Sequence, residues 1–562
     1  MKKFISNAFV LYTSCCLLLF ALPTSFVSAN NTEPIESTSY IHLDKSFYVT
    51  GEVVWYKIYL GPSLKDKSVT IKATIANQKG KVVATEFLQT EGKTYAHGYY
   101  KIPFSADSGM YLLQFTAIDK VAGETLKLSE TFIPVFNDLQ GVPTLVKQDS
   151  SIMEVKEKAP AIPANLKVAI SLPKTNFKQR EAVAATVKVT DAAGNPIFGT
   201  VSVSVIDKEL VGSGKVESTS FSSVEVFQEG MYIQGKVMEE TGTIINKGIL
   251  GAFSAKDDQI FYSKILEDGR FVMKFPAFNG DKRIQFLGNP KTNEYVKVKL
   301  QEEIPVDANV TLPSSNKITT YLNLSRQRKK IFQHYAALES NIKTETIKEN
   351  KKKVKGNQQW IIKEYKNFEY MYIFFKENLS PLRFSFNADS TYTVRMYNPA
   401  NQTSDKFFSG KPLFIIDNVA TRDGDFVARM RMEDVSKVEL FYRLKDLNQN
   451  FKVFGSSGVA KITSYQPLNE LPVKETKNNF TVQGVQKKAI YPVFHPDQIA
   501  NNRRQPFFRP QLYWNPELNT DKSGSTSFTY HQTDDRSTFQ IQVVVQGVDG
   551  QIGYATKEYV VE

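Results

Sequence analysis

Short runs that alternate apolar and polar residues recur along most of this 562-residue chain, with turn signals between them. Residues 201–207 and 111–117 alternate in this way, and 267–271 contains the Asp-Gly pair of a tight hairpin. Aromatic residues make up 12% of the chain, led by 39 Phe and 26 Tyr, and such residues suit half-buried pleated surfaces. The pattern therefore predicts a mainly β protein of about three to five domains, with β-sandwiches in series.

The first 29 residues have the features of a secretory signal. Lys2 and Lys3 supply a charged start, residues 9–22 are largely apolar, and a small-residue cleavage site ends at Ala29. A membrane anchor is the alternative, but the apolar run is interrupted and short for a span of about 20 residues. We expect cleavage before Asn30, which predicts an exported protein.

The only two cysteines, Cys15 and Cys16, lie inside this signal. Lipidation at Cys15 would need a short Leu-containing motif that the preceding residues match poorly. A mature chain without cysteine has no disulfide, thiolate metal site, cysteine nucleophile or internal thioester. No later stretch is long and apolar enough to predict a membrane-spanning helix.

Basic residues outnumber acidic ones, giving a formal net charge of +12. The excess is concentrated at residues 326–330 and 351–353. These clusters predict either attraction to an anionic surface, such as lipopolysaccharide or an acidic partner, or a solvated helix face. We favour the solvated face, and we expect no nucleic-acid partner for an exported protein.

Changes in composition divide the chain into candidate domains. A helix is predicted from residue 318 to about 349, because this stretch is rich in Lys, Arg, Gln, Leu and Ala and lacks Pro and Gly. Residues 368–377 are compatible with helix or strand. The expected units are a signal peptide at 1–29, a sandwich at 37–137, a linker at 138–163, a second β unit at 164–226, a third at 227–305, a helical segment with an α+β unit at 318–465, and a C-terminal β unit at 479–562.

Residues 42–60 resemble the start of the macroglobulin-type domain, the Ig-like sandwich of α2-macroglobulins and their bacterial relatives. The resemblance implies a structural role, with a sharp turn at the glycine, bulk for the core, and polar contacts that fix the strand ends. The residues that match the family pattern are Asp44, Lys45, Tyr48, Gly51, Glu52, Val54 and Trp55. A second, weaker copy of the pattern has Phe177, Arg180, Glu181 and Val183 at the corresponding positions.

Residues 233–278 are similar to the carboxypeptidase regulatory-like sandwich, a module without peptidase activity. The resemblance rests on Gly235, Lys236 and Val237, the hairpin at 267–271, and Phe275. It implies a third small sandwich with a structural role.

Residues 412–465 resemble the plug domain of TonB-dependent receptors, with Asn418 in place of a glycine. A receptor needs a long barrel after its plug, and the roughly hundred residues that follow are too few for one of that kind. We therefore expect a plug-like α+β domain without a barrel. The matching residues are Pro412, Leu413, Asp417, Asp434, Val435, Val438, Glu439, Gly455, Gly458, Ile462 and Thr463.

The C-terminal segment looks like the terminal β module of large Gram-negative envelope proteins that combine such domains. Those proteins have no well-defined biochemical role, so the resemblance implies a compartment and an architecture more than an activity. It is carried by Tyr513, Trp514, Asn515, Pro516, Asp534, Gly547, Gly550 and Gly553.

Recognisable catalytic motifs are missing from the sequence. Ser171 and Lys174 fit an S-x-x-K spacing by chance, because the companion motifs are absent. Asp423-Gly424-Asp425 is compatible with calcium binding but is more typical of a turn. No catalytic, cofactor-binding or metal-binding residue is therefore expected, and none of the histidines has metal-ligand spacing: His42, His97, His334, His495 and His531.

Taken together, the sequence predicts serial Ig-like or macroglobulin-type sandwiches plus one plug-like α+β domain, in a periplasmic or outer-membrane-associated protein. The expected function is non-enzymatic binding or scaffolding among envelope proteins, with TonB-dependent receptors as candidate partners and peripheral contact with the outer membrane. A protease inhibitor without a thioester and a glycan or cell-wall hydrolase remain as alternatives. Tyr513 and Trp514 are candidate contact residues if they are exposed, and core residues if they are not.

Overall fold

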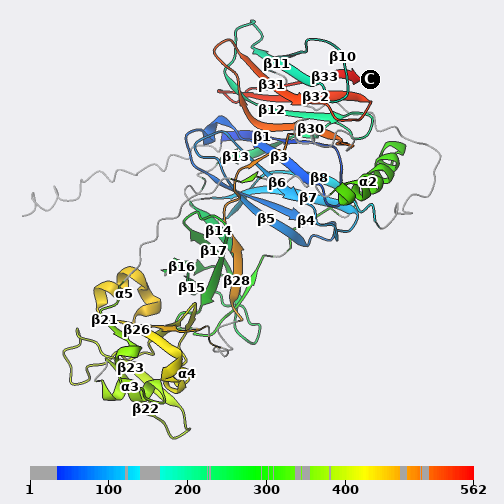
Figure 1. Ribbon diagram of the computed structural model, residues 1–562. Coiled ribbons are helices and arrows are strands. Elements are labelled where there is room, and N and C mark those ends of the chain that lie inside the picture. Colours follow the sequence, from blue (N-terminus) through cyan, green and yellow to red (C-terminus); the bar gives the residue numbers. More distant parts are fainter. Residues whose placement is uncertain are drawn as a thin grey trace, which may run out of the picture.

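The computed structural model describes residues 35–562 except 120–123, 140–164, 224–225, 227–229, 258, 293, 302, 308, 336–342, 345–354, 379–380, 467, 469–476, 494 and 496–505. The expected signal peptide, nearly all of the expected linker at 138–163 and the basic cluster at 351–353 lie outside the described residues. Strands dominate, as the sequence predicts, and they form four units that Figure 1 shows in an elongated arrangement. The fold class is therefore mainly β with one α+β unit.

The first sandwich packs a sheet of order β13-β1-β3-β6 against one of order β2-β8-β7-β4-β5. Its core is aliphatic and aromatic and includes Tyr48, Val54 and Phe115. Strand β13 follows the first strands of the second sandwich in the chain, yet it belongs to the first sandwich, where it pairs with β1 over eight residues. The strands are β1 (Ile35–Leu43), β2 (Tyr48–Val49), β3 (Val53–Tyr59), β4 (Thr70–Ala76), β5 (Val82–Gln89), β6 (Tyr95–Lys101), β7 (Gly109–Ile118), β8 (Thr125–Phe136) and β13 (Val216–Ser223).

The second sandwich is discontinuous in sequence. Strand β11 pairs with β31, and β12 lies between β30 and β32, so each of its two sheets draws strands from both ends of the chain. From the sequence these strands are expected in two separate domains, 164–226 and 479–562, whereas strand pairing joins them in one. They are β9 (Lys167–Ser171), β10 (Asn176–Phe177), β11 (Ala182–Thr190), β12 (Gly199–Asp207), β30 (Gln511–Asn519), β31 (Ser525–His531), β32 (Thr538–Gly547) and β33 (Ile552–Val561).

A seven-stranded sheet follows, of order β19-β14-β17-β16-β15-β18-β28. The predicted Asp-Gly hairpin is present, and Gly269 at its tip has φ +78°. The edge strand β28 follows the α+β unit in the chain and pairs with β18. The seven-stranded sheet, like the second sandwich, is therefore completed by a strand that returns from later in the chain. Its strands are β14 (Met231–Met238), β15 (Gly248–Ser254), β16 (Gln259–Ile265), β17 (Arg270–Phe275), β18 (Asp281–Leu287), β19 (Lys297–Leu300) and β28 (Asn479–Gln483).

The α+β unit is built on a sheet of order β21-β26-β27-β24-β25, with short helices and the hairpin β22–β23 around it. Within 368–377 the structure forms the helix α3, and a small pair β20–β29 lies outside this unit. The elements are β20 (Lys343–Thr344), β21 (Gln358–Ile361), α3 (Met371–Glu377), β22 (Leu382–Phe386), β23 (Tyr392–Met396), β24 (Leu413–Ile416), β25 (Val419–Thr421), α4 (Gly424–Arg429), β26 (Val435–Phe441), α5 (Leu444–Asn450), β27 (Val459–Ser464) and β29 (Ala489–Ile490); single 3-10 turns are Pro62–Leu64, Ile362–Glu364, Met432–Asp434 and Lys452–Gly455.

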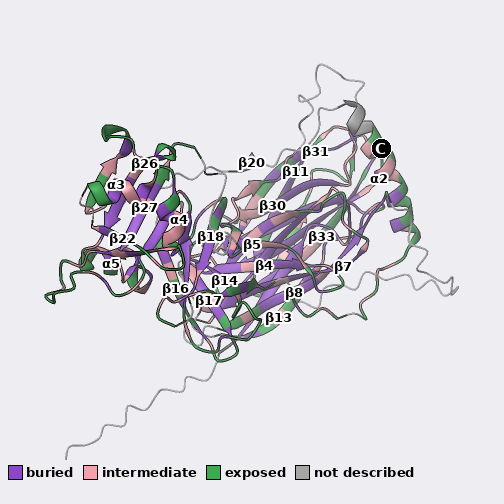
Figure 2. Ribbon diagram, turned by 90° about the horizontal axis from the view of Figure 1, so that it is seen from below, coloured by how far each residue is buried: buried purple, intermediate pink, exposed green. Residues whose placement is uncertain are grey.

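The two sandwiches lie on each other through an interface that combines buried polar groups with small aromatic and aliphatic clusters. The sheet of β1, β3 and β6 faces the sheet of β12, β30 and β32. Figure 2 shows buried residues throughout the strand-rich body that the two sandwiches form. His42 Nδ1 lies 2.6 Å from Ser202 Oγ, and the Tyr59 hydroxyl donates to the carbonyl of Val544 at 3.0 Å. Buried polar groups that are hydrogen-bonded fix one relative orientation, so the two sandwiches act as one body.

Trp55 belongs to this interface and not to the core of the first sandwich, which corrects the expectation from the sequence. Its ring packs on Tyr491, and the two share a small cluster with Trp514. The polar residue Asp44 of the opening segment holds the strand ends, as expected. The Tyr48 hydroxyl donates to Asp44 Oδ1 at 2.5 Å, and the backbone N–H of Trp55 donates to the same oxygen at 2.9 Å.

The longest helix among the described residues, α2 (Asn316–Tyr335), lies against both sandwiches. Its apolar side, with Ile318, Tyr321 and Leu322, packs against residues of both sandwiches, including Phe47 and Ile206. The helix is shorter than the expected 318–349, and most of the remainder lies outside the described residues.

The basic cluster at 326–330 is largely an anchor and not the solvated face that we favoured. Lys329 Nζ lies 2.7 Å from Asp138 of the first sandwich, and the Arg326 guanidinium donates to the Asp138 carbonyl at 2.7 Å. Arg328 pairs with Asp535 of the second sandwich. The helix therefore ties the two sandwiches together through both charge and apolar packing.

Candidate functional site

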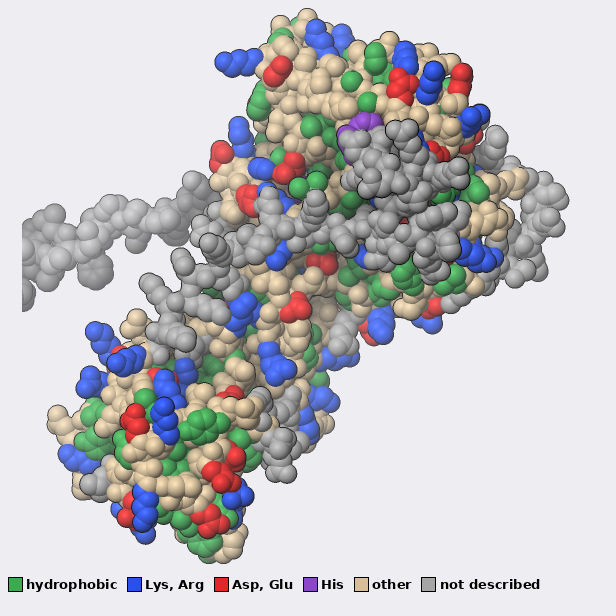
Figure 3. Space-filling view, viewed as in Figure 1, with side chains coloured by type: hydrophobic (Ala, Val, Ile, Leu, Met, Phe, Trp, Pro, Cys, Tyr) green, Lys and Arg blue, Asp and Glu red, His purple; other side chains and the backbone are tan. Residues whose placement is uncertain are grey.

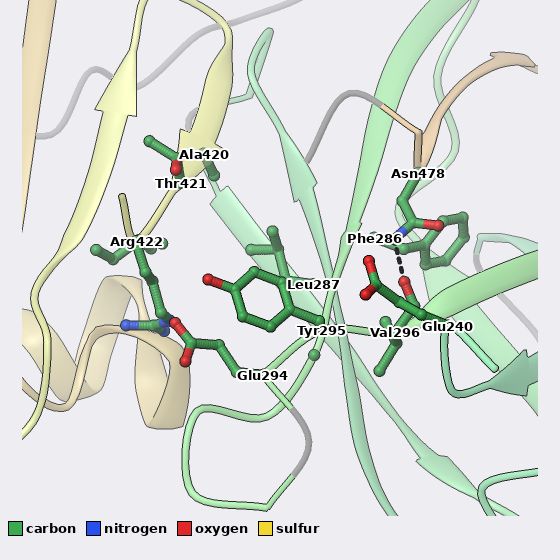
Figure 4. A pocket seen from close by; sticks show the side chains of 12 residues that line it. Glu240, Phe286, Leu287, Glu294, Tyr295, Val296, Ala420, Thr421, Arg422 and Asn478 are labelled. Carbon is green, nitrogen blue, oxygen red and sulfur yellow. Dashed lines mark hydrogen bonds between the residues drawn. The ribbon is translucent and has the colours of Figure 1, made fainter. Parts of the chain in front are cut away.

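The α+β unit is fixed to the seven-stranded sheet by a close-packed joint, shown in Figure 4. Gln285 of β18 exchanges two hydrogen bonds with the backbone of Ala420, at 2.6 and 2.7 Å. The Phe454 ring lies on Gly251 so closely that a Cβ there would come within 2.6 Å of it. Phe253 and Ile260 of the sheet belong to the same apolar core as the α+β unit. The unit is thus held in one orientation.

A cavity at this joint has a volume of about 40 Å³, enough for a few water molecules. Arg422 lines it, and its guanidinium donates to the carbonyls of Lys411, at 3.1 Å, and Phe454. Burial lowers the pKa of Arg422 to about 10, and Glu294 across the cavity opposes that shift. The polar side chains that line the cavity come from both units, as Figure 4 shows. Since carbonyl groups already satisfy the buried charge, we assign the cavity to the joint and not to a ligand.

The surface best suited to binding is a row of four aromatic side chains on the α+β unit: Tyr370, Tyr372, Tyr392 and Phe386, hereafter the aromatic row. Successive ring centroids lie 6.2, 4.9 and 5.0 Å apart. Phe386 is 63% exposed, and the three tyrosines are half-buried. Figure 3 shows hydrophobic side chains among charged ones at this end of the molecule.

Local structure fixes the rings of this row. Tyr372 is in α3, whereas Tyr392 and Phe386 belong to paired strands in which they lie directly opposite each other. The Arg429 guanidinium lies over the Tyr392 ring, 5.5 Å from its centroid, and Asp425 holds that guanidinium through contacts of 3.0 and 3.1 Å. Rings held in this way lose little conformational freedom on binding.

The sequence did not single out these four residues, because they share no period and the topology alone brings them together. The candidates that it did name lie elsewhere. Tyr513 is 7% exposed and lies in the core of the second sandwich, and Trp514 is 2% exposed and lies in the interface cluster with Trp55, so neither is an exposed contact residue. Asp423 caps α4 by accepting from the N–H of Phe426 at 2.8 Å, which is the structural alternative to calcium binding.

The S-x-x-K residues are also structural. Ser171 ends β9, and Lys174 pairs with Glu181 at 2.6 Å. The adjacent carboxylates Asp534 and Asp535 are each ion-paired with an arginine. No group of three His, Cys, Asp or Glu side chains arranged for a metal ion occurs among the described residues.

The described histidines are dispersed apart from one pair. His495 and His531 meet with ring centroids 4.6 Å apart, which their sequence separation did not reveal. His97 lies 3.3 Å from Glu517, and His334 is in α2, where its side chain lies outside the described part. His42 is fully buried between the sandwiches, and burial lowers its pKa to about 3.

Buried titratable groups gather at the interface between the sandwiches. Lys57 is fully buried and donates to Thr200 Oγ1 at 2.9 Å and to the carbonyl of Pro516 at 2.6 Å. Burial lowers the pKa of Lys57 well below its ordinary value. Its ammonium also lies over the Tyr95 ring at 4.0 Å. This lysine is packed on several sides and serves the interface.

Within the described part of the chain, every helix is too short or too polar to span a membrane. No protein-family model and no curated protein matches the chain.

Among solved structures, the chain is similar to Salmonella α2-macroglobulin reacted with methylamine, at 9% identity and a TM-score of 0.23, over 94% of this chain and 40% of that one. It is similar to native Escherichia coli α2-macroglobulin at 9% identity and a TM-score of 0.24, with the same coverage. The Yersinia pseudotuberculosis adhesin InvE matches at 10% identity and a TM-score of 0.13, over 48% and 62% of the chains. The chain spans about two fifths of the macroglobulins, and likenesses of this strength do not establish a shared activity.

Proposed function

We propose that this protein is a non-enzymatic binding protein of the cell envelope, and that it binds a partner protein through the aromatic row. The single observation that carries this proposal is the row itself: four ordered rings, one of them largely exposed, beside an immobilised arginine. Tyr, Phe and Arg are enriched where protein interfaces bury most of their binding energy.

The architecture suits such a role. The α2 helix and their shared interface hold the two sandwiches as one body, and the joint at Gln285 and Gly251 holds the α+β unit on the seven-stranded sheet. A rigid support reduces the entropy lost when the row meets its partner.

Several features favour binding over catalysis. The buried groups with the largest pKa shifts described above, such as His42 and Lys57, are packed between sheets and do not line a cleft. The hydrolase and inhibitor alternatives gain no supporting observation among the described residues.

The class of partner follows from the sequence. The N-terminal signal favours export, and the plug-like pattern at 412–465 favours envelope proteins, with TonB-dependent receptors among them. Both arguments rest on sequence patterns, so the experiment leaves the partner open.

The test places a photo-crosslinking amino acid at Phe386 in the full chain, expressed in a Gram-negative host and irradiated in intact cells. We expect a discrete adduct with an envelope protein. The same adduct should disappear when Tyr392→Ser is added, because this substitution removes the central ring of the row.

The matched control places the crosslinker at Phe198, which is 56% exposed on the second sandwich. Identical adducts from both positions, or an adduct that survives Tyr392→Ser, would contradict the proposal. Turnover of peptidoglycan by the purified protein would favour the hydrolase instead, and stable retention of a protease after cleavage would favour the inhibitor.

A further inference from the structure

The outer face of the seven-stranded sheet carries a set of exposed cations. Lys236 of β14 lies directly opposite Lys299 of β19 on one side and Arg270 of β17 on the other. Lys297 is two residues from Lys299, so it points to the same face. Lys264 of β16 is next to the core residue Ile265, which pairs with Phe271, and it therefore faces outward as Arg270 does. These five exposed residues are hereafter the basic face.

Like charges directly opposite each other on a sheet destabilise it. At the centre of the basic face Lys236 has a cation on both sides, with Cβ atoms about 5 Å apart. Arg270 pairs with Asp268, but the four lysines make no ion pair with any other described residue. Repulsion between these cations lowers the folding stability of the isolated chain. Binding of an anionic partner over the cations would offset that cost and explain why they lie together.

Exposed apolar side chains lie within the same face. Ile249 is directly opposite Lys264, and Tyr262 is two residues from Lys264 on the same strand. Ile249 is 37% exposed and Tyr262 is 52% exposed. The ammonium of Lys452, from the α+β unit, lies 3.9 Å from the centroid of the Tyr262 ring and adds a further positive charge.

We propose that the basic face binds the surface of a membrane that contains anionic phospholipid. Lysine and arginine are attracted to the negative potential of such a surface, and tyrosine and isoleucine can enter the interfacial layer beside them. A soluble acidic partner would account for the charges but not for exposed apolar side chains between them. The basic face is separate from the aromatic row, so the two proposals stand independently.

The test is co-sedimentation of the chain from Asn30 onward with vesicles of phosphatidylcholine containing 30% phosphatidylglycerol. The wild-type chain is expected to bind these vesicles, to bind pure phosphatidylcholine at least about tenfold more weakly, and to dissociate as salt is raised. The double variant Lys236→Glu/Lys299→Glu is expected to lose at least about tenfold in binding. Tyr262→Ser should weaken binding, with a larger relative effect at high salt.

The matched control is Lys178→Glu/Lys557→Glu, which makes the same change in net charge at exposed positions of the second sandwich. It should bind within about twofold of the wild type, and circular dichroism should show that both double variants are folded. Equal loss in the two double variants would overturn the proposal, as would failure of the wild type to bind the anionic vesicles. Binding of soluble polyglutamate without binding of vesicles would also overturn it. The Tyr392→Ser variant should bind the anionic vesicles as the wild type does, because its substitution lies in the aromatic row and not in the basic face.

Discussion

The two sandwiches contain the same strand–turn–strand unit in two different environments. In the first, Lys45 pairs with Glu52 at 2.7 Å, and in the second Lys174 pairs with Glu181 at 2.6 Å. In each, the glutamate accepts from the backbone N–H three residues before it, at 3.0 and 2.8 Å. The short strand before each turn pairs in parallel with a later strand of its own sandwich, β2 with β8 and β10 with β33. The second copy inferred from the sequence therefore has the geometry of the first.

The copies differ in burial and in the residue at the turn. The side chains of Lys45 and Glu52 are 4% and 18% exposed, whereas those of Lys174 and Glu181 are 47% and 32% exposed. The left-handed turn position is Gly51 in the first copy, with φ +87°, and Arg180 in the second, with φ +61°. The same local motif is therefore buried and packed in the first sandwich and solvent-exposed in the second.

The largest predicted difference concerns the Lys–Glu pair. Lys45→Ala leaves Glu52 partly buried without its cation, so we expect the free energy of unfolding to fall by about 3–5 kcal/mol. Lys174→Ala should leave it almost unchanged, because that pair is exposed to solvent. Urea denaturation of the two variants checks this, and equal losses would show that the copies are energetically equivalent.

The next prediction concerns Asp44, which the second copy replaces with Pro173. Burial raises the pKa of Asp44 from 3.8 to about 6, although Lys45 opposes the shift. The folded state therefore holds a proton that the unfolded state releases, and this group's contribution to stability falls as the pH rises from about 4 to about 6.

Asp44→Asn removes that dependence. The stability of the variant relative to wild type should rise by up to about 3 kcal/mol between pH 4 and pH 7. Taking the difference cancels other buried acids, such as Asp207. Denaturation curves across this pH range provide the measurement, and a difference that does not vary with pH would show that Asp44 titrates normally in the folded protein.

A smaller effect is expected at the left-handed turn position. Arg180→Gly and Arg180→Ala both remove the ion pair with Asp534, but only glycine adopts φ +61° without strain. The glycine variant should therefore be more stable than the alanine variant by about 1 kcal/mol. In the first copy Gly51→Ala should cost more, because the added Cβ would also meet the Phe104 ring. Gly194→Ala, at φ +91° with no atom within 4 Å of the added Cβ, measures the cost of the backbone strain alone. Identical melting temperatures for the two Arg180 variants would contradict the assignment.

Local features of the fold could be read from the sequence because their determinants are local. The alternation in β12, the Asp-Gly hairpin before β17 and the polar contacts of Asp44 all depend on residues close in sequence. The same reasoning failed for Trp55 and for α2, whose partners Tyr491, Asp138 and Asp535 are distant along the chain.

The joining of strands from both ends of the chain was missed for the same reason. A half-sandwich and a complete one have the same alternation, so the pattern in 164–226 and 479–562 does not reveal that each needs the other to cover its apolar face. The aromatic row is a similar case, since α3 and the β22–β23 hairpin meet only in the folded unit.

Strands on either side of the inserted units form one sandwich, and an engineered disulfide between two of them provides the decisive test. Thr186 and Ser527 are registered partners on β11 and β31, with hydroxyl oxygens 2.9 Å apart. From Asn30 onward the chain contains no cysteine, so the pair Thr186→Cys/Ser527→Cys can form only one intramolecular bond. The control Thr186→Cys/Ser523→Cys moves the partner four residues away, into the turn that precedes β31. We predict nearly complete oxidation of the first pair, read by thiol titration of the folded protein, and little of the control. Free thiols in both variants would show that β11 and β31 are not paired.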